Sequence, residues 1–191
     1  MKSHFFAYIS RMRFIQRWAL MRNTAQENVQ EHSHQVAVLA HALAVIRNRE
    51  FGGHVDAGLV AVAALYHDAS EILTGDLPTP IKYYNSSIRN AYKDVEAVAC
   101  GQLLEMLPEN LRPDYVPVLT EVDPDIEKLV KAADKLSAYA KCLEELKSGN
   151  REFGKAAEQT LEALNSYNMP EVEYFMEHFL AGFALTLDEL K

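Results

Sequence analysis

The sequence has little cysteine: only Cys100 and Cys142 occur among its 191 residues, and they do not form a C-x-x-C pair. Two cysteines are too few for a secreted disulfide framework, and their spacing excludes a zinc site of the usual cysteine type. The chain also lacks an apolar run of about 18 residues, which a membrane-spanning helix needs. These absences predict a cytoplasmic protein that does not associate with membranes.

Basic residues are scarce as well, because 27 acidic residues outnumber 19 Lys and Arg and leave a formal net charge of -8. This balance excludes broad, non-specific nucleic-acid binding, which needs a basic surface. The first 26 residues are the exception, since they contain no acidic residue and carry Lys2, Arg11, Arg13, Arg17 and Arg22. Such a start suits either a transit peptide or a local lobe that attracts anions.

Linkers and strand-like alternation are both absent. No stretch rich in Pro, Gly or Ser divides the chain, so we expect one domain, residues 1–191. Hydrophobic residues recur at helical spacing, which predicts an all-α fold, with Asp56 and Asp123 as helix caps. The expected helices cover residues 4–15, 31–47, 57 to about 72, 86–107, 124 to about 147, 153–164 and 171–180, with a short helix or turn at 111–120. In the helix over 86–107, the residues expected to face inward are Ile88, Tyr92, Val95, Ala99 and Leu103.

Two connecting segments are predicted to be loops. Residues 16–30 have no clear hydrophobic period and contain the only tryptophan of the chain, Trp18. Residues 76–80 read Asp-Leu-Pro-Thr-Pro and follow Gly75. Because each proline restricts its own backbone and that of the preceding residue, we expect a stiff loop there, after a helix that ends at Gly75.

Four residues of metal-ligand type are predicted to face the interior. His67 and Asp68 are adjacent and follow a run of small apolar residues, Asp134 follows two alanines, and His32 lies four residues before Val36 in a helical stripe. A single His or Asp in such a setting is more often structural. Two imidazoles and two carboxylates from three separate helices, however, suit a Mn, Co, Fe or Mg ion with open coordination positions. Open positions indicate catalysis.

Two further acids lie close in sequence to the His67-Asp68 pair. Glu71 lies four residues after His67, on the same face of the predicted helix, and Asp76 follows Gly75. A carboxylate beside a metal ion can orient or deprotonate an attacking water, so we predict that Glu71 is catalytic and that Asp76 is a second candidate. The alternatives are an exposed, salt-bridged Glu71 and an Asp76 that only stabilises the turn.

The order H…HD…D in an all-α chain resembles the HD-domain superfamily of metal-dependent phosphohydrolases. More narrowly, four strings that extend over nearly the whole chain are similar to those of the bacterial HD-domain 5′-deoxynucleotidases: RW at 17–18, ENVQEHS at 27–33, YHDASEILTGDLPTP at 66–80 and KAADKLSAYAKCLEE at 131–145. The resemblance implies a helical HD-domain bundle that hydrolyses deoxyribonucleoside 5′-monophosphates to deoxynucleosides and phosphate, with little preference among bases. It also implies a homodimer and a divalent cation, with Co²⁺ favoured and Mn²⁺ or other divalent ions as alternatives.

The same resemblance implies roles for individual residues. Arg17 would orient the phosphate through its bidentate guanidinium, and Trp18 would lie against the sugar, where a 2′-hydroxyl collides or stays unpaired. The alternatives are a surface arginine and a tryptophan that fills the core under the first helix. The predicted substrate-binding residues are Arg17, Trp18, His32, His67, Asp76, Leu77, Pro78, Thr79 and Asp134.

Two other functions are compatible with an HD-domain chain. A phosphohydrolase for nucleoside triphosphates, cyclic dinucleotides or a guanosine alarmone would need additional basic residues, and the chain has few after residue 22. A non-catalytic sensing module would be expected to lack the water-handling acid or one of the ligands. Near the end of the chain, four aromatic residues either cap the core or face a partner: Tyr174, Phe175, Phe179 and Phe183.

Overall fold

The computed structural model describes residues 2–82 and 84–190, so Met1, Tyr83 and Lys191 of the predicted domain lie outside the described residues. Within these ranges the fold is all-α, as predicted, and the one β-type pairing is an isolated bridge between Gln16 and Asn28. The elements are α1 (Phe5–Ile9), η1 (Ser10–Phe14), α2 (Val29–Glu50), α3 (Ala57–Tyr66), α4 (Glu71–Thr74), α5 (Thr79–Lys82), α6 (Ser86–Glu105), α7 (Arg112–Leu119), α8 (Pro124–Lys147), η2 (Arg151–Phe153), α9 (Gly154–Ser166), α10 (Pro170–His178) and η3 (Leu180–Ala184).

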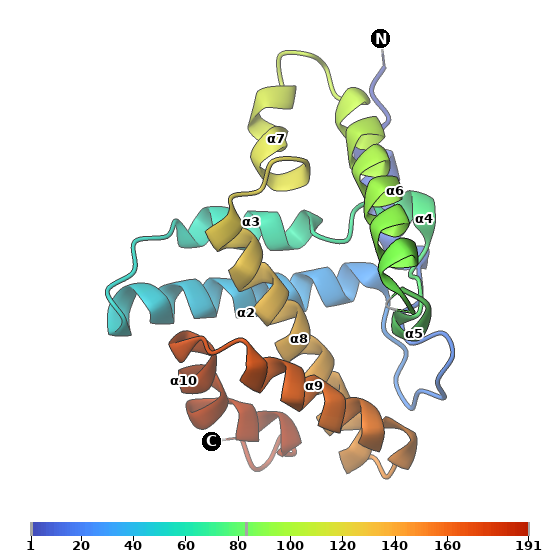
Figure 1. Ribbon diagram of the computed structural model, residues 1–191. Helices are drawn as coiled ribbons and strands as arrows, with labels where there is room; N and C mark the ends of the chain where they lie inside the picture. The colour runs from blue at the N-terminus through green and yellow to red at the C-terminus, as the bar shows by residue number, and fades with distance from the viewer. Residues whose placement is uncertain (1, 83, 191) are drawn as a thin grey trace.

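Three helices form the centre of the fold. Helices α2 and α3 run side by side, α8 crosses both, and α9 packs along α8 (Figure 1). Fully buried leucines and valines fill the contact, among them Leu43 of α2, Val60 of α3 and Leu136 of α8. The crossing brings the start of α2, the end of α3 and the middle of α8 to one place. In the part of the chain that the structure describes, no helix has the length and hydrophobicity that a membrane span requires.

Polar side chains set the starts of the long helices. Asp56 accepts a hydrogen bond from Leu59 N at 3.0 Å, and Asp123 accepts one from Asp125 N at 2.8 Å, so both predicted caps are confirmed. Helix α2 starts two residues earlier than predicted, because Asn28 and Glu31 form a reciprocal capping box. The side chain of Asn28 accepts from Glu31 N at 3.0 Å, and that of Glu31 accepts from Asn28 N at 3.3 Å.

The prediction of one helix over residues 57–72 is wrong, because the chain turns at the His67-Asp68 pair. Helix α3 ends at Tyr66, residues 67–70 form a turn, and α4 begins at Glu71. In the turn, Ala69 N donates to Tyr66 O at 2.9 Å and Glu71 N donates to Asp68 O at 3.0 Å. Both hydrogen bonds span three residues, as in a 3-10 helix, and not four as in an α-helix. Gly75, with φ of 73°, then ends α4, as predicted.

Two other local predictions need correction. The stiff loop after Gly75 extends only to Pro78, because Thr79–Lys82 forms the short helix α5, whose second residue, Pro80, needs no backbone donor there. The predicted inward stripe of α6 holds at Ala99 and Leu103, which are buried, whereas Ile88 and Val95 are 37% and 51% exposed. The first half of α6 stands at the edge of the fold, where few elements cover it (Figure 1).

Of the aromatic residues near the end of the chain, some cap the core and one is largely exposed. Phe175 is buried, and Tyr174 and Phe183 pack against the core. Phe179 is 51% exposed, although its ring centroid lies 5.2 Å from that of Phe175. Most of this cluster therefore caps the core.

Candidate active site

The four residues of metal-ligand type come together where the central helices cross. His32 lies in the first turn of α2, His67 and Asp68 in the turn after α3, and Asp134 in the middle of α8. His32 Nε2 lies 3.1 Å from Asp134 Oδ1 and 3.6 Å from Asp68 Oδ2, and His67 Nε2 lies 3.1 Å from Asp68 Oδ2. The ligand atoms of His32, His67 and Asp68 all lie within 4.8 Å of one another, and Asp134 joins this group through His32.

The hydrogen bonds of the two imidazoles leave one nitrogen of each ring available as a ligand. His67 Nδ1 lies 2.7 Å from Ala64 O, which only accepts, so Nδ1 carries the proton. Ser137 donates its hydroxyl proton to Gln35 Oε1, so its Oγ, 3.2 Å from His32 Nδ1, accepts from that nitrogen. Both Nε2 atoms are buried, lack a hydrogen-bond partner among the described residues, and face carboxylate oxygens. Lone pairs that converge on carboxylates suit a divalent cation with nitrogen and oxygen ligands.

Charge keeps the two carboxylates of this group ionised. Burial raises the pKa of Asp68, but His67, His32 and Arg17 more than offset it, so the pKa lies well below its ordinary value. Burial likewise raises the pKa of Asp134, and the adjacent His32 ring and the charges of Lys135 and Arg17 reverse the shift. Both groups therefore remain anionic ligands at neutral pH.

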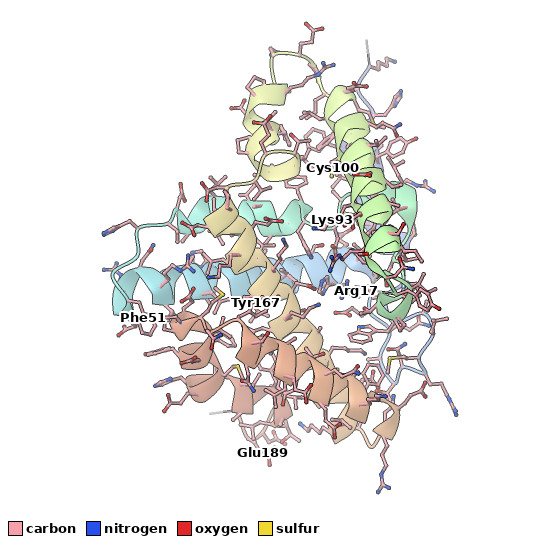
Figure 2. All side chains as sticks on the ribbon, viewed as in Figure 1. Arg17, Phe51, Lys93, Cys100, Tyr167 and Glu189 are labelled. Atoms are coloured by element: carbon pink, nitrogen blue, oxygen red, sulfur yellow. The ribbon has the colours of Figure 1, made fainter. Side chains whose placement is uncertain are left out.

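Arg17 is part of this group, so the alternative of a surface arginine is wrong. Its side chain is only 13% exposed, and Figure 2 shows it beside the start of α2, facing α8 and α6. Arg17 NH1 lies 3.3 Å from Asp68 Oδ2, and NH2 lies 3.9 Å from Asp134 Oδ1. Burial lowers the pKa of the guanidinium, but the charges of Asp134, Asp68 and Glu27 raise it by more than burial lowers it. The net shift is upward, so Arg17 stays charged.

Glu71 is a buried carboxyl group at the start of α4, and the alternative of an exposed, salt-bridged residue is wrong. It is 5% exposed, and its Oε2 has no hydrogen-bond partner among the described residues. Burial, together with the charges of Asp68 and Asp76, raises the pKa of Glu71 to about 9. Burial also raises the pKa of Asp76. With a pKa of about 9, the metal-free protein holds a proton on Glu71, and a cation bound at the cluster would favour the ionised form, so Glu71 is a candidate acid–base group.

The loop from Asp76 to Thr79, which is predicted to bind the nucleoside, is fixed at both ends by side chains of α6. Tyr92 of α6 donates to Gly75 O at 3.4 Å, and its hydroxyl lies 3.2 Å from Thr74 Oγ1. At the other end of the loop, Lys82 Nζ bonds Glu96 Oε1 at 2.9 Å and lies 4.7 Å from the centre of the Tyr92 ring. Asp76, Leu77 and Pro78 are half-buried, whereas Thr79 is exposed.

Trp18 does not lie under the first helix. Its ring packs 5.3 Å from that of Phe153, against a small second core of Cys142, Phe153 and Ala157. Its Nε1 donates to Glu27 Oε2 at 2.8 Å, and the residue as a whole is half-buried. One side of the indole is therefore fixed against α8 and α9.

A cleft of about 580 Å³ extends from the ligand cluster between α6 and α8. His67, Asp68 and Asp134 line one end of it. Four basic residues after position 22 also line it, which the sequence analysis did not foresee: Lys82, Arg89, Lys93 and Lys131. Figure 2 shows Lys93 and Cys100 on the face of α6 that looks toward this cleft. The spacing of four between Arg89 and Lys93 was the available signal, but no local pattern says which space a helix face will line.

The loop that carries Arg17 and Trp18 is anchored on α8 by a buried carboxylate, Glu145. Glu145 is 1% exposed and accepts hydrogen bonds from Thr24 N at 2.9 Å, Thr24 Oγ1 at 2.7 Å and Asn150 Nδ2 at 2.8 Å. Lys141, one helical turn earlier, donates both to Glu145 and to Ala25 O. The network joins residues 24 and 25 to the end of α8.

We expect Glu145→Gln to lower the free energy of unfolding by about 3–5 kcal/mol, because it leaves the buried ammonium of Lys141 without its carboxylate. Urea denaturation followed by circular dichroism measures the change. The control is Glu127→Gln, which breaks the exposed pair with Lys131 on the same helix and is expected to cost about 0.5 kcal/mol or less. Equal effects of the two variants would contradict the anchoring role of Glu145.

Comparisons with known proteins agree with this geometry. A family model described as 5′-deoxynucleotidase YfbR-like matches residues 4–183. The 5′-deoxynucleotidase YfbR of Escherichia coli is 54% identical over 191 residues, covering 99% of this chain and 96% of that protein. The 5′-deoxynucleotidase of Vibrio cholerae is 52% identical over 191 residues, with coverages of 99% and 98%.

Solved structures share the fold. An HD-domain phosphohydrolase from Listeria innocua matches with a TM-score of 0.82 at 25% identity, covering 94% of this chain and 88% of that one. The HD phosphohydrolase of cyanophage S-2L, which was solved with dA and one catalytic Zn²⁺ ion, has the same fold at a TM-score of 0.60 and 19% identity, covering 92% of this chain and 96% of that one. The predicted HD-domain bundle and the family resemblance are confirmed. The chain belongs to the YfbR-like 5′-deoxynucleotidase family of HD-domain phosphohydrolases.

Proposed function

We propose that this protein hydrolyses deoxyribonucleoside 5′-monophosphates to deoxynucleosides and phosphate, with a divalent cation held by His32, His67, Asp68 and Asp134. One observation carries the proposal: two buried imidazole nitrogens converge with carboxylates in a chain that is 52–54% identical to 5′-deoxynucleotidases over nearly its whole length. The bound cation supplies the positive charge that offsets the charge developing on the phosphate. The resemblance alone supports Co²⁺ as an effective ion, with Mn²⁺ as an alternative, and a homodimer.

The residues around the cluster each have a separate role in the hydrolysis of the phosphate ester. The oxygen of a water attacks phosphorus, the bond to the 5′-oxygen breaks, and the deoxynucleoside leaves with a proton on that oxygen. Glu71, ionised beside the cation, orients the water and takes up its proton, and the leaving 5′-oxygen then receives a proton as Glu71 releases its own; Asp76 is the second candidate for this role. Arg17 orients the phosphate, since its charged guanidinium already lies against Asp68.

Substrate binding extends from the cluster to the two loops. His32, His67 and Asp134 contact the phosphate, in addition to their role as ligands. Trp18 lies against the sugar, and Asp76, Leu77, Pro78 and Thr79 line the nucleoside. The hold of α6 on the loop at residues 76–79 supports this part of the proposal, because a loop whose ends are bonded can present fixed groups.

Phosphate release tests the proposed function. Chelator-stripped protein is assayed with dAMP, AMP, 3′-dAMP and dATP, with and without Co²⁺ or Mn²⁺. Metal-dependent release from dAMP, in preference to the other three, is the expected result. Release mainly from dATP would instead establish a triphosphohydrolase, a second candidate that the basic residues of the cleft favour. Release from none of them would leave a non-catalytic nucleotide-sensing module.

We expect Trp18→Ala to relax the selection against ribonucleotides, because the indole is what leaves no room for a 2′-hydroxyl. The ratio of kcat/KM for dAMP over AMP should fall by about tenfold or more, chiefly because AMP turnover rises. Phe14→Ala is the control, since this aromatic side chain is 62% exposed on η1. An unchanged ratio in Trp18→Ala would assign Trp18 to packing against Phe153 alone.

A further inference from the structure

Trp18 has a backbone conformation that is unusual for a bulky residue. Its φ is 58°, in the left-handed region, and among residues 2–82 and 84–190 the only other non-glycine residue with a positive φ is Asn168. Asn tolerates this region, but a large side chain is strained there. Such strain persists only where surrounding contacts impose it, and it concentrates at functional sites.

Glu27 imposes this conformation through both its backbone and its side chain. Arg17 N donates to Glu27 O at 2.9 Å, which fixes the peptide between Gln16 and Arg17, one residue before Trp18. Trp18 Nε1 donates to Glu27 Oε2 at 2.8 Å, and Arg17 Nε lies 3.4 Å from the same oxygen. The main chain and both side chains of the Arg17-Trp18 pair are therefore fastened to one residue.

The carboxylate of Glu27 also faces the ligand cluster. Its side chain is only 12% exposed, and its Oε1 lies 3.8 Å from His32 Nδ1. Burial raises the pKa of Glu27, but the nearby His32 ring, the charge of Arg17 and the hydrogen bond from Trp18 more than offset this shift, so the group stays ionised. Glu27 therefore lies beside His32 of the cluster and contacts both residues that the proposed function assigns to the phosphate and the sugar, Arg17 and Trp18.

We propose that Glu27 is a positioning residue that sets the selection for deoxyribose, by holding the indole of Trp18 and the guanidinium of Arg17 in fixed places relative to the cluster. It touches neither the sugar nor the reacting atoms. Its effect passes through Trp18, whose strained backbone relaxes when the Glu27 acceptor is absent. The claim that Glu27 sets the selection for deoxyribose rests on the proposed function. The claim that Glu27 holds Trp18 and Arg17 in place does not.

The test compares Glu27→Met, which keeps the length of the side chain but has no acceptor oxygen, with Glu27→Gln, which keeps one. The matched control is Glu171→Met, since Glu171 is also buried, at 2% exposure, and accepts from Arg47 Nε at 2.8 Å at the far end of α2. Trp18 is the only tryptophan, so acrylamide quenching of intrinsic fluorescence in ligand-free protein reports its position directly. The second readout is the ratio of kcat/KM for dAMP over AMP.

In Glu27→Met we expect stronger quenching and a ratio that falls by about tenfold. Glu27→Gln should show smaller changes in both, and Glu171→Met should show neither, even if it is less stable. Wild-type quenching and a wild-type ratio in Glu27→Met would overturn the proposal, and stronger quenching with an unchanged ratio would overturn its selectivity part.

A replacement variant and a readout that is independent of activity keep the test decisive. If circular dichroism shows that Glu27→Met does not fold, Glu27→Asp replaces it, because the shorter carboxylate does not reach Trp18 Nε1. If the wild type does not hydrolyse dAMP, the proposed function fails, whereas the quenching comparison still decides whether Glu27 holds Trp18.

Discussion

Asp68→Ala is expected to lower metal-dependent turnover of dAMP by a factor of about 1,000 or more, in proportion to the loss of the ion. Asp68 Oδ2 lies 3.1 Å from His67 Nε2, 3.6 Å from His32 Nε2 and 3.3 Å from Arg17 NH1. No other described carboxylate oxygen has contacts with both imidazoles and with the guanidinium. Its removal takes a ligand from the proposed cation site and takes from Arg17 its nearest carboxylate.

Metal content separates loss of the ion from loss of the fold. The variant is equilibrated with Co²⁺, and the bound cobalt is measured by elemental analysis beside kcat/KM for dAMP. Asp94→Ala is the control, because Asp94 is exposed on α6. A folded Asp68→Ala protein that binds stoichiometric cobalt and keeps wild-type turnover would contradict the site.

Glu71→Gln is expected to lower kcat by a factor of about 100 to 10,000 while the protein still binds the metal, because the amide cannot take a proton from water. Glu71 is buried at the first residue of α4 and lies outside the cluster of ligand atoms. Measured cobalt content should therefore match that of the wild type. Glu158→Gln, an exposed residue of α9, is the control. Wild-type kcat in Glu71→Gln would transfer the role of base to Asp76.

The raised pKa of Glu71 adds a stability test in metal-free protein. Because its pKa is raised to about 9, the folded protein holds a proton that the unfolded chain releases near the ordinary value. The contribution of Glu71 to stability is therefore full below the ordinary glutamate pKa and is lost as the pH rises from that value toward 9. Glu71→Gln removes this dependence, so its Tm should exceed that of the wild type at pH 8 by more than at pH 5, both measured with chelator. An equal difference at the two pH values would mean that Glu71 is not a buried acid.

Local chemistry was enough to predict much of the fold. Asp56 and Asp123 cap helices because a side-chain oxygen beside a free backbone N–H works without help from the rest of the chain. The helical periods around Val36 and Leu136 reflect the same short-range geometry, and both residues are buried. The order H…HD…D also indicated the class of chemistry, since imidazole and carboxylate groups are the usual side-chain ligands of divalent cations where cysteine is absent.

Tertiary contacts decided the features that the sequence analysis missed. The helix period continues through His67, yet the chain turns there, and this turn places His67 and Asp68 against the start of α2 and the middle of α8. Glu27 resembles any loop glutamate until the fold places it beside Trp18. Ile88 and Leu103 lie in one helical stripe, but Leu103 is buried in the core, whereas the first half of α6 packs on the short helices α4 and α5, which leave Ile88 37% exposed. The sequence by itself therefore determined most of the long helices, the caps at Asp56 and Asp123 and the residue types of the cluster. The crossing of α2, α3 and α8 decided which groups are buried together, because burial depends on residues distant in the chain.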